Sequence, residues 1–213
     1  MKKNTFNLKS FNSLPIIGIL RHFSLEEIRP IIPIYLAAGF TTVEITMNTE
    51  NVLKIITSLK QDFPSLNVGA GTVCSISDLE KALEAGASFI VTPITSTNII
   101  NHCVKEQIPI FPGAYSPTEI HLAYSLGATA VKVFPATQLG PTYIKDILGP
   151  LNNIKLLPTG GVTKENLISF LNAGAFGVGM GNSLFDKALI KTKDYNYLEN
   201  HFNQIASIVK SKI

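Results

Sequence analysis

A short phrase that ends in glycine recurs four times along the chain, and it constrains the fold more than any other feature. The four copies are Ala38-Gly39, Ala85-Gly86, Leu126-Gly127 and Ala173-Gly174. Each lies at the end of a stretch with helical spacing, where a glycine adopts the left-handed conformation that other residues resist. A run of β-forming residues follows every copy. The repeat therefore predicts a chain of alternating helices and strands.

Eight β-forming runs can be counted in the 213 residues, and eight is the number of strands in a TIM-type barrel. Four follow the glycine phrases, at residues 42–46, 89–92, 130–134 and 176–179, and four lie between them, at residues 16–21, 67–73, 108–112 and 155–159. We expect an α/β fold: a single (β/α)8 TIM-type barrel domain over residues 1–213, with an extra N-terminal helix before Ser13 that closes the bottom. A doubly wound open sheet is the alternative.

Cap-forming residues indicate where several of the helices begin. Ser24, Ser77 and Thr163 each precede a helical stretch with acidic residues in its first turn, as N-caps do. Residues 186–213 are expected to hold the last helix of the barrel.

The composition excludes several classes of protein. Apolar residues make up 46% of the chain and charged residues 15%, so a large core can form and a disordered binding segment is not expected. The net charge is +3 and no basic run is interleaved with aromatic residues, so we expect no nucleic acid partner. No apolar run is long enough to span a membrane, so we expect no membrane partner either.

The cysteines and histidines lack the spacing of metal ligands. Cys74 and Cys103 cannot form a disulfide framework or a zinc site, and they favour a cytoplasmic protein. None of the four histidines forms a metal-binding pair, so we expect no metal.

Two charged residues lie inside predicted strands, where both faces of a barrel strand should be apolar. Lys132 stands between two valines, and Glu44 stands between a valine and an isoleucine. If the apolar neighbours face the outer helices, both charges face the barrel interior, on the second and sixth strands, which share interior layers. A structural ion pair is one interpretation. Catalysis is the other, because a buried amine has a lowered pKa and a nearby carboxylate can transfer protons to its adduct.

Glycine-rich turns follow the seventh and eighth predicted strands. Gly160 and Gly161 follow the seventh, and the segment 177–183 covers the end of the eighth and its turn. Glycine lets backbone N–H groups approach a ligand closely, and the loops after these two strands are the usual phosphate site of TIM-type barrels. Turns that need glycine for their geometry alone are the alternative. The pattern favours a phosphorylated small molecule as the ligand.

Six segments, in the same order, resemble one family of enzymes. They are VEIT at 43–46, GAGTV at 69–73, VTP at 91–93, FPG at 111–113, VKVFPA at 131–136 and PTGGV at 158–162. Between residues 16 and 185 the chain resembles the 2-keto-3-deoxy-6-phosphogluconate (KDPG) aldolases, which are also described as 4-hydroxy-2-oxoglutarate (KHG) aldolases.

The resemblance implies a class I aldolase, which forms a Schiff base with its substrate and releases pyruvate and an aldehyde. Lys132 matches the Schiff-base lysine, and Glu44 matches the general acid and base. The matching substrate-binding residues are Thr72 and Phe134 around the pyruvate moiety, Pro93 at the mouth, and Gly160, Gly161 and Ser183 at the phosphate. The resemblance also implies a homotrimer without metal or organic cofactor, a small-molecule 2-keto acid phosphate as substrate, and a place in the Entner–Doudoroff pathway.

One departure from the family concerns the carboxylate of the substrate. Where KDPG aldolases read Leu-Arg-Thr, this chain reads Met-Asn-Thr at 47–49. We expect Arg21, at the end of the first strand, to bind the carboxylate in place of the missing arginine, and Asn48 to contact a hydroxyl group. An ion pair between Arg21 and Glu26 or Glu27 is the alternative.

The same departure leaves the substrate open. Asn48 and the segment 140–145 resemble the branch that acts on 2-keto-3-deoxy-6-phosphogalactonate (KDPGal), whereas Pro158-Thr159 resembles the gluconate branch. Either C4 epimer is therefore a candidate, and so is phosphate-free KHG. A sugar-phosphate isomerase or epimerase, and a catalytically silent barrel that only binds a phosphorylated ligand, are the rival functions.

Overall fold

Parallel strands form the centre of the computed structural model, which describes residues 6–212. In chain order the strands are β1 (Ile16–Leu20), β2 (Thr42–Thr46), β3 (Asn67–Gly71), β4 (Ile90–Val91), β5 (Ile110–Phe111), β6 (Gly113–Ala114), β7 (Val131–Val133), β8 (Leu156–Pro158) and β9 (Val178–Met180). Eight of them fall at the eight predicted strand positions. The fifth predicted run, 108–112, contains β5, and β6 follows just beyond it after Pro112, which has no N–H group to donate to a sheet.

The strands close into a barrel. One parallel sheet has the order β5-β4-β3-β2-β1-β9, and a second has the order β6-β7-β8. β5 and β6 are consecutive along the chain, and a parallel bridge between Thr159 and Gly179 joins the end of β8 to β9. Every strand position therefore has a neighbour on both sides, as a (β/α)8 barrel requires, and the alternative of an open doubly wound sheet is wrong.

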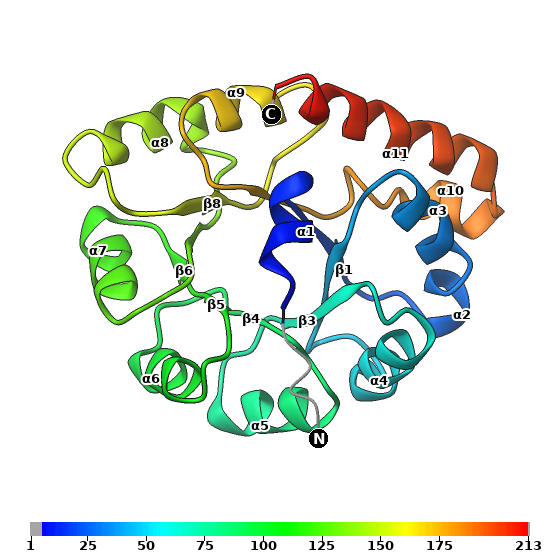
Figure 1. Ribbon diagram of the computed structural model, residues 1–213, viewed down its shortest axis with the longest axis horizontal. Coiled ribbons are helices and arrows are strands. Elements are labelled where there is room, and N and C mark those ends of the chain that lie inside the picture. The colour runs from blue at the N-terminus through cyan, green and yellow to red at the C-terminus, as the bar shows by residue number, and fades with distance from the viewer. Residues whose placement is uncertain (1–5, 213) are drawn as a thin grey trace.

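Helices form an outer ring around the strands (Figure 1). They are α2 (Leu25–Ile28), α3 (Ile31–Ala37), α4 (Val52–Asp62), α5 (Ile76–Glu84), α6 (Thr97–Lys105), α7 (Pro117–Ser125), α8 (Gly140–Leu148), α9 (Leu167–Asn172), α10 (Lys187–Thr192) and α11 (Tyr195–Lys210). The glycines of the recurring phrase follow α3, α5, α7 and α9, with φ of 101° at Gly39, 95° at Gly86, 101° at Gly127 and 99° at Gly174. The predicted helix ends are therefore confirmed. Within residues 6–212, no helix combines the length and apolar character that crossing a bilayer requires.

The predicted helix starts agree with the structure in one case and differ in another. Ser24 caps α2, and its hydroxyl and the Glu27 carboxylate form a reciprocal capping box. The prediction that Ser77 caps the next such helix is wrong. Ser75 stands two residues earlier and accepts a hydrogen bond from the Asp78 N–H at 3.0 Å, so α5 begins sooner.

Two further helix boundaries differ from the predictions. Residues 163–166 form a turn, in which the Thr163 N–H donates to the Asn166 side chain at 2.8 Å, so α9 begins after it. Residues 186–212 hold two helices, where the sequence predicted one helix over 186–213. Lys193 has a φ of 57° and ends α10, and the Asp194 side chain then caps α11.

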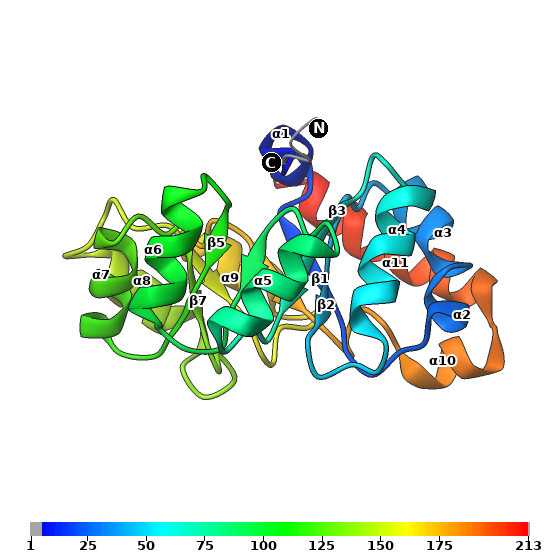
Figure 2. The same ribbon diagram turned by 90° about the horizontal axis from the view of Figure 1, so that it is seen from below.

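Aromatic side chains fill the barrel at the amino-terminal ends of the strands. Phe11 of α1 (Leu8–Ser13) is fully buried in a cluster with Phe89, Phe111 and other barrel residues. Asn7 and Asn67 hold α1 to β3, because the Asn7 N–H donates to the Asn67 side chain at 2.8 Å and that side chain donates back at 3.1 Å. α1 crosses the centre of the ring in Figure 1 and lies at one end of the barrel in Figure 2. The predicted helix that closes the bottom is confirmed, and the opposite end is left for a site.

Candidate active site

Glu44 is a buried carboxylate in the wall of the barrel. Its neighbours on β2, Val43 and Ile45, pack in the outer core against the helices, so Glu44 points into the barrel. Only 1% of the residue is exposed, and within the described residues its Oε1 atom has no hydrogen-bond partner. Native proteins rarely leave a buried carboxylate oxygen unpaired, and a catalytic role is one explanation for such an atom.

Lys132 is a buried amine on β7, in the same barrel interior. Val131 and Val133 pack in the outer core, and Lys132 is 3% exposed. Its Nζ atom lies 4.8 Å from the centre of the Phe134 ring, two residues further along and on the same side. Strand alternation thus places both predicted catalytic side chains where the sequence predicted them.

Lys132 and Glu44 affect one another's pKa, although they form no direct ion pair. Burial lowers the pKa of Lys132, Glu44 opposes this shift, and Arg21 adds to it. Burial likewise raises the pKa of Glu44, and Lys132 and Arg21 oppose the rise. Burial therefore moves this pair toward a neutral amine and a neutral carboxyl group.

No direct ion pair offsets these shifts. Within residues 6–212 the ion pair that forms joins Arg29 to Asp62 on the surface. The structural interpretation of Lys132 and Glu44 as a closed ion pair is therefore wrong. Arg21 likewise forms no ion pair with Glu26 or Glu27, so the alternative interpretation of Arg21 is also wrong.

The chain at the end of β3 makes room for the Glu44 carboxylate. A Cβ atom at Gly71 would collide with the carboxyl group of Glu44, so a larger residue here would displace that group from its position. The next residue, Thr72, has a φ of 57°, which is unusual and strained for a β-branched side chain. Strain of this kind is stored at functional sites when the surrounding structure holds it in place.

A cavity of about 390 Å³ opens at the carboxyl-terminal ends of β1, β7, β8 and β9. It brings together six of the predicted site residues: Arg21, Lys132, Phe134, Gly160, Gly161 and Ser183. Four predicted residues do not line it. Glu44 is one of them, although the charges of Lys132 and Arg21, which do line it, lower the pKa of Glu44 against the effect of burial. Asn48 is exposed on the turn after β2, and Thr72 and Pro93 are half-buried after β3 and β4.

The loops after β8 and β9 form the other end of the cavity. Gly161 has a φ of 75°, and a Cβ atom there would collide with Thr137. Within the described part of the chain, the backbone N–H groups of Gly161, Val162, Asn182 and Ser183 donate to no protein acceptor. The Ser183 hydroxyl donates to the Val162 carbonyl at 2.6 Å, so at this residue the backbone N–H, and not the hydroxyl, is free to donate to an anion.

Among the lining residues that the sequence reasoning did not assign to the site are two polar side chains, Thr159 and Lys187. Thr159 is 4% exposed and follows β8 with its side chain inward, a position that the alternation from Leu157 could have revealed. Lys187 is the first residue of α10, and an exposed lysine at a helix start carries no signal of its own. No group of three or more histidine, cysteine or acidic side chains among residues 6–212 could hold a metal ion.

Comparison with known proteins gives a consistent result. A family model described as "KDPG and KHG aldolase" matches residues 8–201. The chain is 35% identical over 187 residues to the 2-dehydro-3-deoxy-phosphogluconate aldolase of Pseudomonas aeruginosa, over 87% of this chain and 84% of that one. It is 33% identical over 174 residues to the 2-dehydro-3-deoxy-6-phosphogalactonate aldolase of Escherichia coli K12, over 81% of this chain and 85% of that one.

A solved structure of an aldolase also matches this chain. The KDPG aldolase of Legionella pneumophila, described with pyruvate captured as a covalent carbinolamine, matches with a TM-score of 0.85 and 27% identity, over 92% of this chain and 96% of that one. Both the sequence and the barrel are therefore shared with these lyases across most of their length. The chain belongs to the KDPG and KHG aldolase family.

Proposed function

We propose that this class I aldolase cleaves a 2-keto-3-deoxy-6-phospho sugar acid to pyruvate and glyceraldehyde 3-phosphate, with Lys132 as nucleophile and Glu44 as proton carrier. The observation that carries the proposal is the pair itself. A buried amine stands near a buried carboxylate with an unpaired oxygen, and no ion pair neutralises either group. A purely structural pair would gain nothing from staying apart, whereas a Schiff-base site needs the amine free and a proton carrier within reach.

The first half of the reaction joins the substrate to Lys132. The neutral amine attacks the C2 ketone to form a carbinolamine, in which the alkoxide has taken the amine's proton. Burial favours the neutral carboxyl form of Glu44, which protonates the carbinolamine hydroxyl. Water leaves, and an iminium on Lys132 and a Glu44 carboxylate remain.

The second half breaks the carbon–carbon bond. The Glu44 carboxylate takes the proton of the C4 hydroxyl, the C3–C4 bond breaks toward the iminium, and the aldehyde departs. Glu44, protonated again, gives its proton to C3 of the enamine. Water then adds to the iminium and gives a proton to the Glu44 carboxylate. The hydroxyl proton of the carbinolamine moves to nitrogen as the C–N bond breaks, which releases pyruvate and restores the neutral amine of Lys132 and the neutral carboxyl group of Glu44.

The two ends of the cavity suit the two ends of such a substrate. We propose that Arg21 binds the pyruvate carboxylate, with Thr72, Phe134 and Pro93 around the reacting carbons. At the other end, the free N–H groups of the loops that contain Gly160, Gly161 and Ser183 would bind the phosphate. We assign Asn48 to a substrate hydroxyl group, which would influence the choice of C4 epimer.

The rival functions account less well for the buried Lys132 amine and the unpaired Glu44 oxygen. A sugar-phosphate isomerase or epimerase needs acid and base groups but has no use for a buried lysine amine. A silent binding barrel has no use for the unpaired Glu44 oxygen, since burying it costs stability. Phosphate-free KHG remains a second candidate substrate, because it can reach Lys132 without the loop end of the cavity.

We further propose a cytoplasmic homotrimer with a place in the Entner–Doudoroff pathway. Both cysteines are free thiols, which suits a reducing compartment. Large apolar side chains are exposed, among them Ile94 at 48% and Tyr115 at 45%, and subunit contacts would cover such residues.

Steady-state cleavage of KDPG, KDPGal and KHG, followed by pyruvate release, tests the proposal and ranks the substrates. We expect kcat/KM for at least one phosphorylated epimer to exceed that for KHG. An Asn48→Ala protein should change the ratio of the two epimers more than the rate with KHG. Absence of pyruvate from all three substrates would contradict the proposal.

A further inference from the structure

Three cationic side chains line the active-site cavity, and the proposed function uses only two of them. Arg21 and Lys132 belong to the strand end, where both act on the pKa of Glu44. Lys187 is the third. It lines the same cavity from the start of α10, the helix that follows the loop after β9. The N–H groups at that end are neutral donors, so Lys187 is the cation available there to a dianionic group.

Nothing in the described part of the chain neutralises Lys187. The ion pair found among residues 6–212 lies elsewhere, at Arg29 and Asp62. The adjacent Asp186 carboxylate is occupied, because its Oδ1 accepts hydrogen bonds from the N–H groups of Ala188 at 2.8 Å and Leu189 at 3.2 Å. The Lys187 ammonium is therefore free to pair with an anion that enters the cavity.

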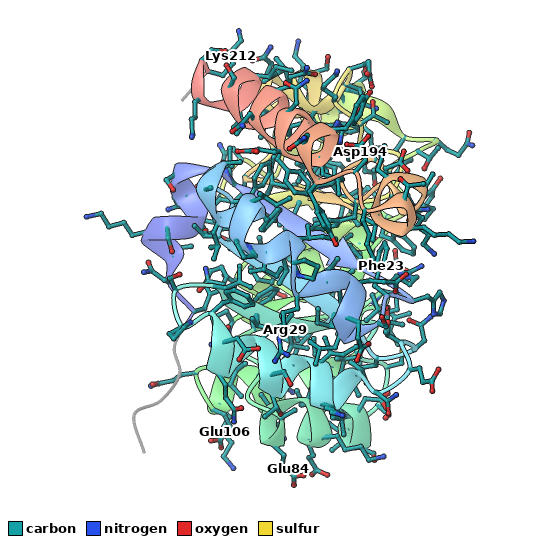
Figure 3. All side chains as sticks on the ribbon, turned by 90° about the vertical axis from the view of Figure 1, so that its right-hand side faces the viewer. Phe23, Arg29, Glu84, Glu106, Asp194 and Lys212 are labelled. Atoms are coloured by element: carbon teal, nitrogen blue, oxygen red, sulfur yellow. The ribbon has the colours of Figure 1, made fainter. Side chains whose placement is uncertain are left out.

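The Lys187 ammonium is placed on an aromatic ring. Its Nζ atom lies 5.5 Å from the centre of the Phe23 ring, within the range of a cation–π contact. Phe23 follows β1, is 4% exposed and lies beside α10 (Figure 3). It also forms part of the wall of an adjoining hollow of about 510 Å³, which Glu26 and Glu27 line. The ring thus contacts the ammonium of a lysine that lines the active-site cavity.

A cation–π contact at an exposed site is weaker than a charge-assisted hydrogen bond to phosphate. A phosphate at the loop end can therefore draw the ammonium from the ring. A lysine has four rotatable side-chain bonds, so this movement needs no change in the backbone. The phosphate-free substrate KHG ends in a C5 carboxylate, which is nearer the reacting carbons than a C6 phosphate and extends less far toward Lys187.

We infer that Lys187 is a specificity-determining residue, which binds the terminal phosphate of the substrate and makes the enzyme favour phosphorylated 2-keto acids over phosphate-free ones. The inference rests on the proposed function and deepens it. Lys187 acts only on the binding of the phosphate end and takes no part in proton transfer or in the Schiff base.

The test is a Lys187→Met protein, which keeps the length of the side chain and removes its charge. With the preferred phosphorylated substrate, KM should rise by roughly 10–100-fold, the range of one charge-assisted hydrogen bond, while kcat changes little. KM for KHG should stay at the wild-type value. Inorganic phosphate, as a competitive inhibitor of cleavage, should bind the variant more weakly by a similar factor, and Lys187→Arg should restore much of the loss.

Lys191→Met is the matched control, because Lys191 is exposed on the same helix and does not line the cavity. It should leave every constant unchanged. Equal KM changes for KHG and the phosphorylated substrate, or none for either, would overturn the inference.

Borohydride trapping of pyruvate on each protein distinguishes failure of the proposed function from failure of the inference about Lys187. Loss of trapping in the wild type would refute the proposed function, whereas intact trapping with phosphate binding indifferent to Lys187 would refute only this inference.

Discussion

The two ends of the active-site cavity are built in different ways. At the strand end, charged side chains project from β1, β2 and β7, and Glu44 and Lys132 are almost fully buried. At the loop end, the donors are backbone N–H groups and one exposed lysine. The difference matches the chemistry that we propose for each end. A Schiff base needs a shifted pKa, which requires burial on a rigid element, whereas an anion needs only donors aimed at it.

The strand end also carries a cost that the loop end avoids. Burial disfavours the charged forms of Lys132 and Glu44, and an unpaired carboxylate oxygen reduces stability further. The loop end keeps its unpaired groups near solvent, where water can satisfy them in the absence of ligand. Substitutions at the strand end should therefore change the chemistry most, and substitutions at the loop end should change binding.

The largest effect is expected from Glu44→Gln. The amide keeps the shape of the side chain but cannot carry the proton, so kcat for cleavage should fall by roughly 10²–10⁴. Trapping of pyruvate at Lys132 should continue more slowly. Glu50 is exposed in the turn that follows β2, so Glu50→Gln is the control, and this protein should cleave the substrate at the wild-type rate. Cleavage near the wild-type rate in the Glu44 variant would mean that Glu44 is only structural.

Arg21→Met should weaken the binding of pyruvate and substrate. A charge-assisted hydrogen bond contributes about 1.5–3 kcal/mol, which corresponds to roughly 10–150-fold in Kd. Both phosphorylated and phosphate-free substrates should be affected, since both carry the carboxylate. Arg29→Met removes an arginine from a surface ion pair with Asp62 and serves as the control. Unchanged KM values in the Arg21 variant would refute its assignment to the carboxylate.

The pH dependence of trapping should reveal the interaction between the two buried groups. The Glu44 carboxylate favours the ammonium form of Lys132, so it raises the pKa of Lys132 against the effect of burial. In Glu44→Gln that opposition is lost, the pKa of Lys132 falls further, and the amine becomes free at lower pH. The midpoint of the trapping rate against pH should therefore move to lower pH. A shift to higher pH would contradict the electrostatic account.

The smallest effect on catalysis is expected from Ser183→Ala, at the loop end. The hydroxyl donates to the Val162 carbonyl, so its loss should lower the free energy of unfolding by about 1 kcal/mol and Tm by about 2–4 °C. The Ser183 N–H is unchanged, so KM for a phosphorylated substrate should change little. A tenfold increase in that KM with an unchanged Tm would show that the hydroxyl itself binds phosphate.

The strand end was the more predictable of the two from sequence. A charge among alternating apolar residues is visible without a structure, and this alone placed Glu44 and Lys132 in the barrel interior. The separation of the two groups was not predictable, because spacing along the chain does not reveal whether facing side chains pair. Gly71 belonged to a recognised motif, yet its contact with Glu44 emerges only from the packing of β3 against β2.

At the loop end the glycines were predictable and the side chains were not. Gly160 and Gly161 indicated a turn that exposes N–H groups, but the direction of the Ser183 hydroxyl depends on a contact across two loops. Lys187, at the start of α10, contacts Phe23 in the segment after β1, and a contact between segments so far apart in the sequence could not be predicted. The fold followed more directly from the sequence, since the glycine after each helix acts locally. Helix starts were less certain where two serines compete as caps, as Ser75 and Ser77 do.

The most direct test of the account is to locate the covalent bond. The wild-type protein is incubated with pyruvate and borohydride, and the adduct is mapped by intact mass and by peptide analysis. We expect a single pyruvate joined through a reduced imine to Lys132, and no adduct in a Lys132→Met protein that is otherwise folded. An adduct on Lys145 or Lys155, or no adduct at all, would contradict the claim that Lys132 is the Schiff-base lysine.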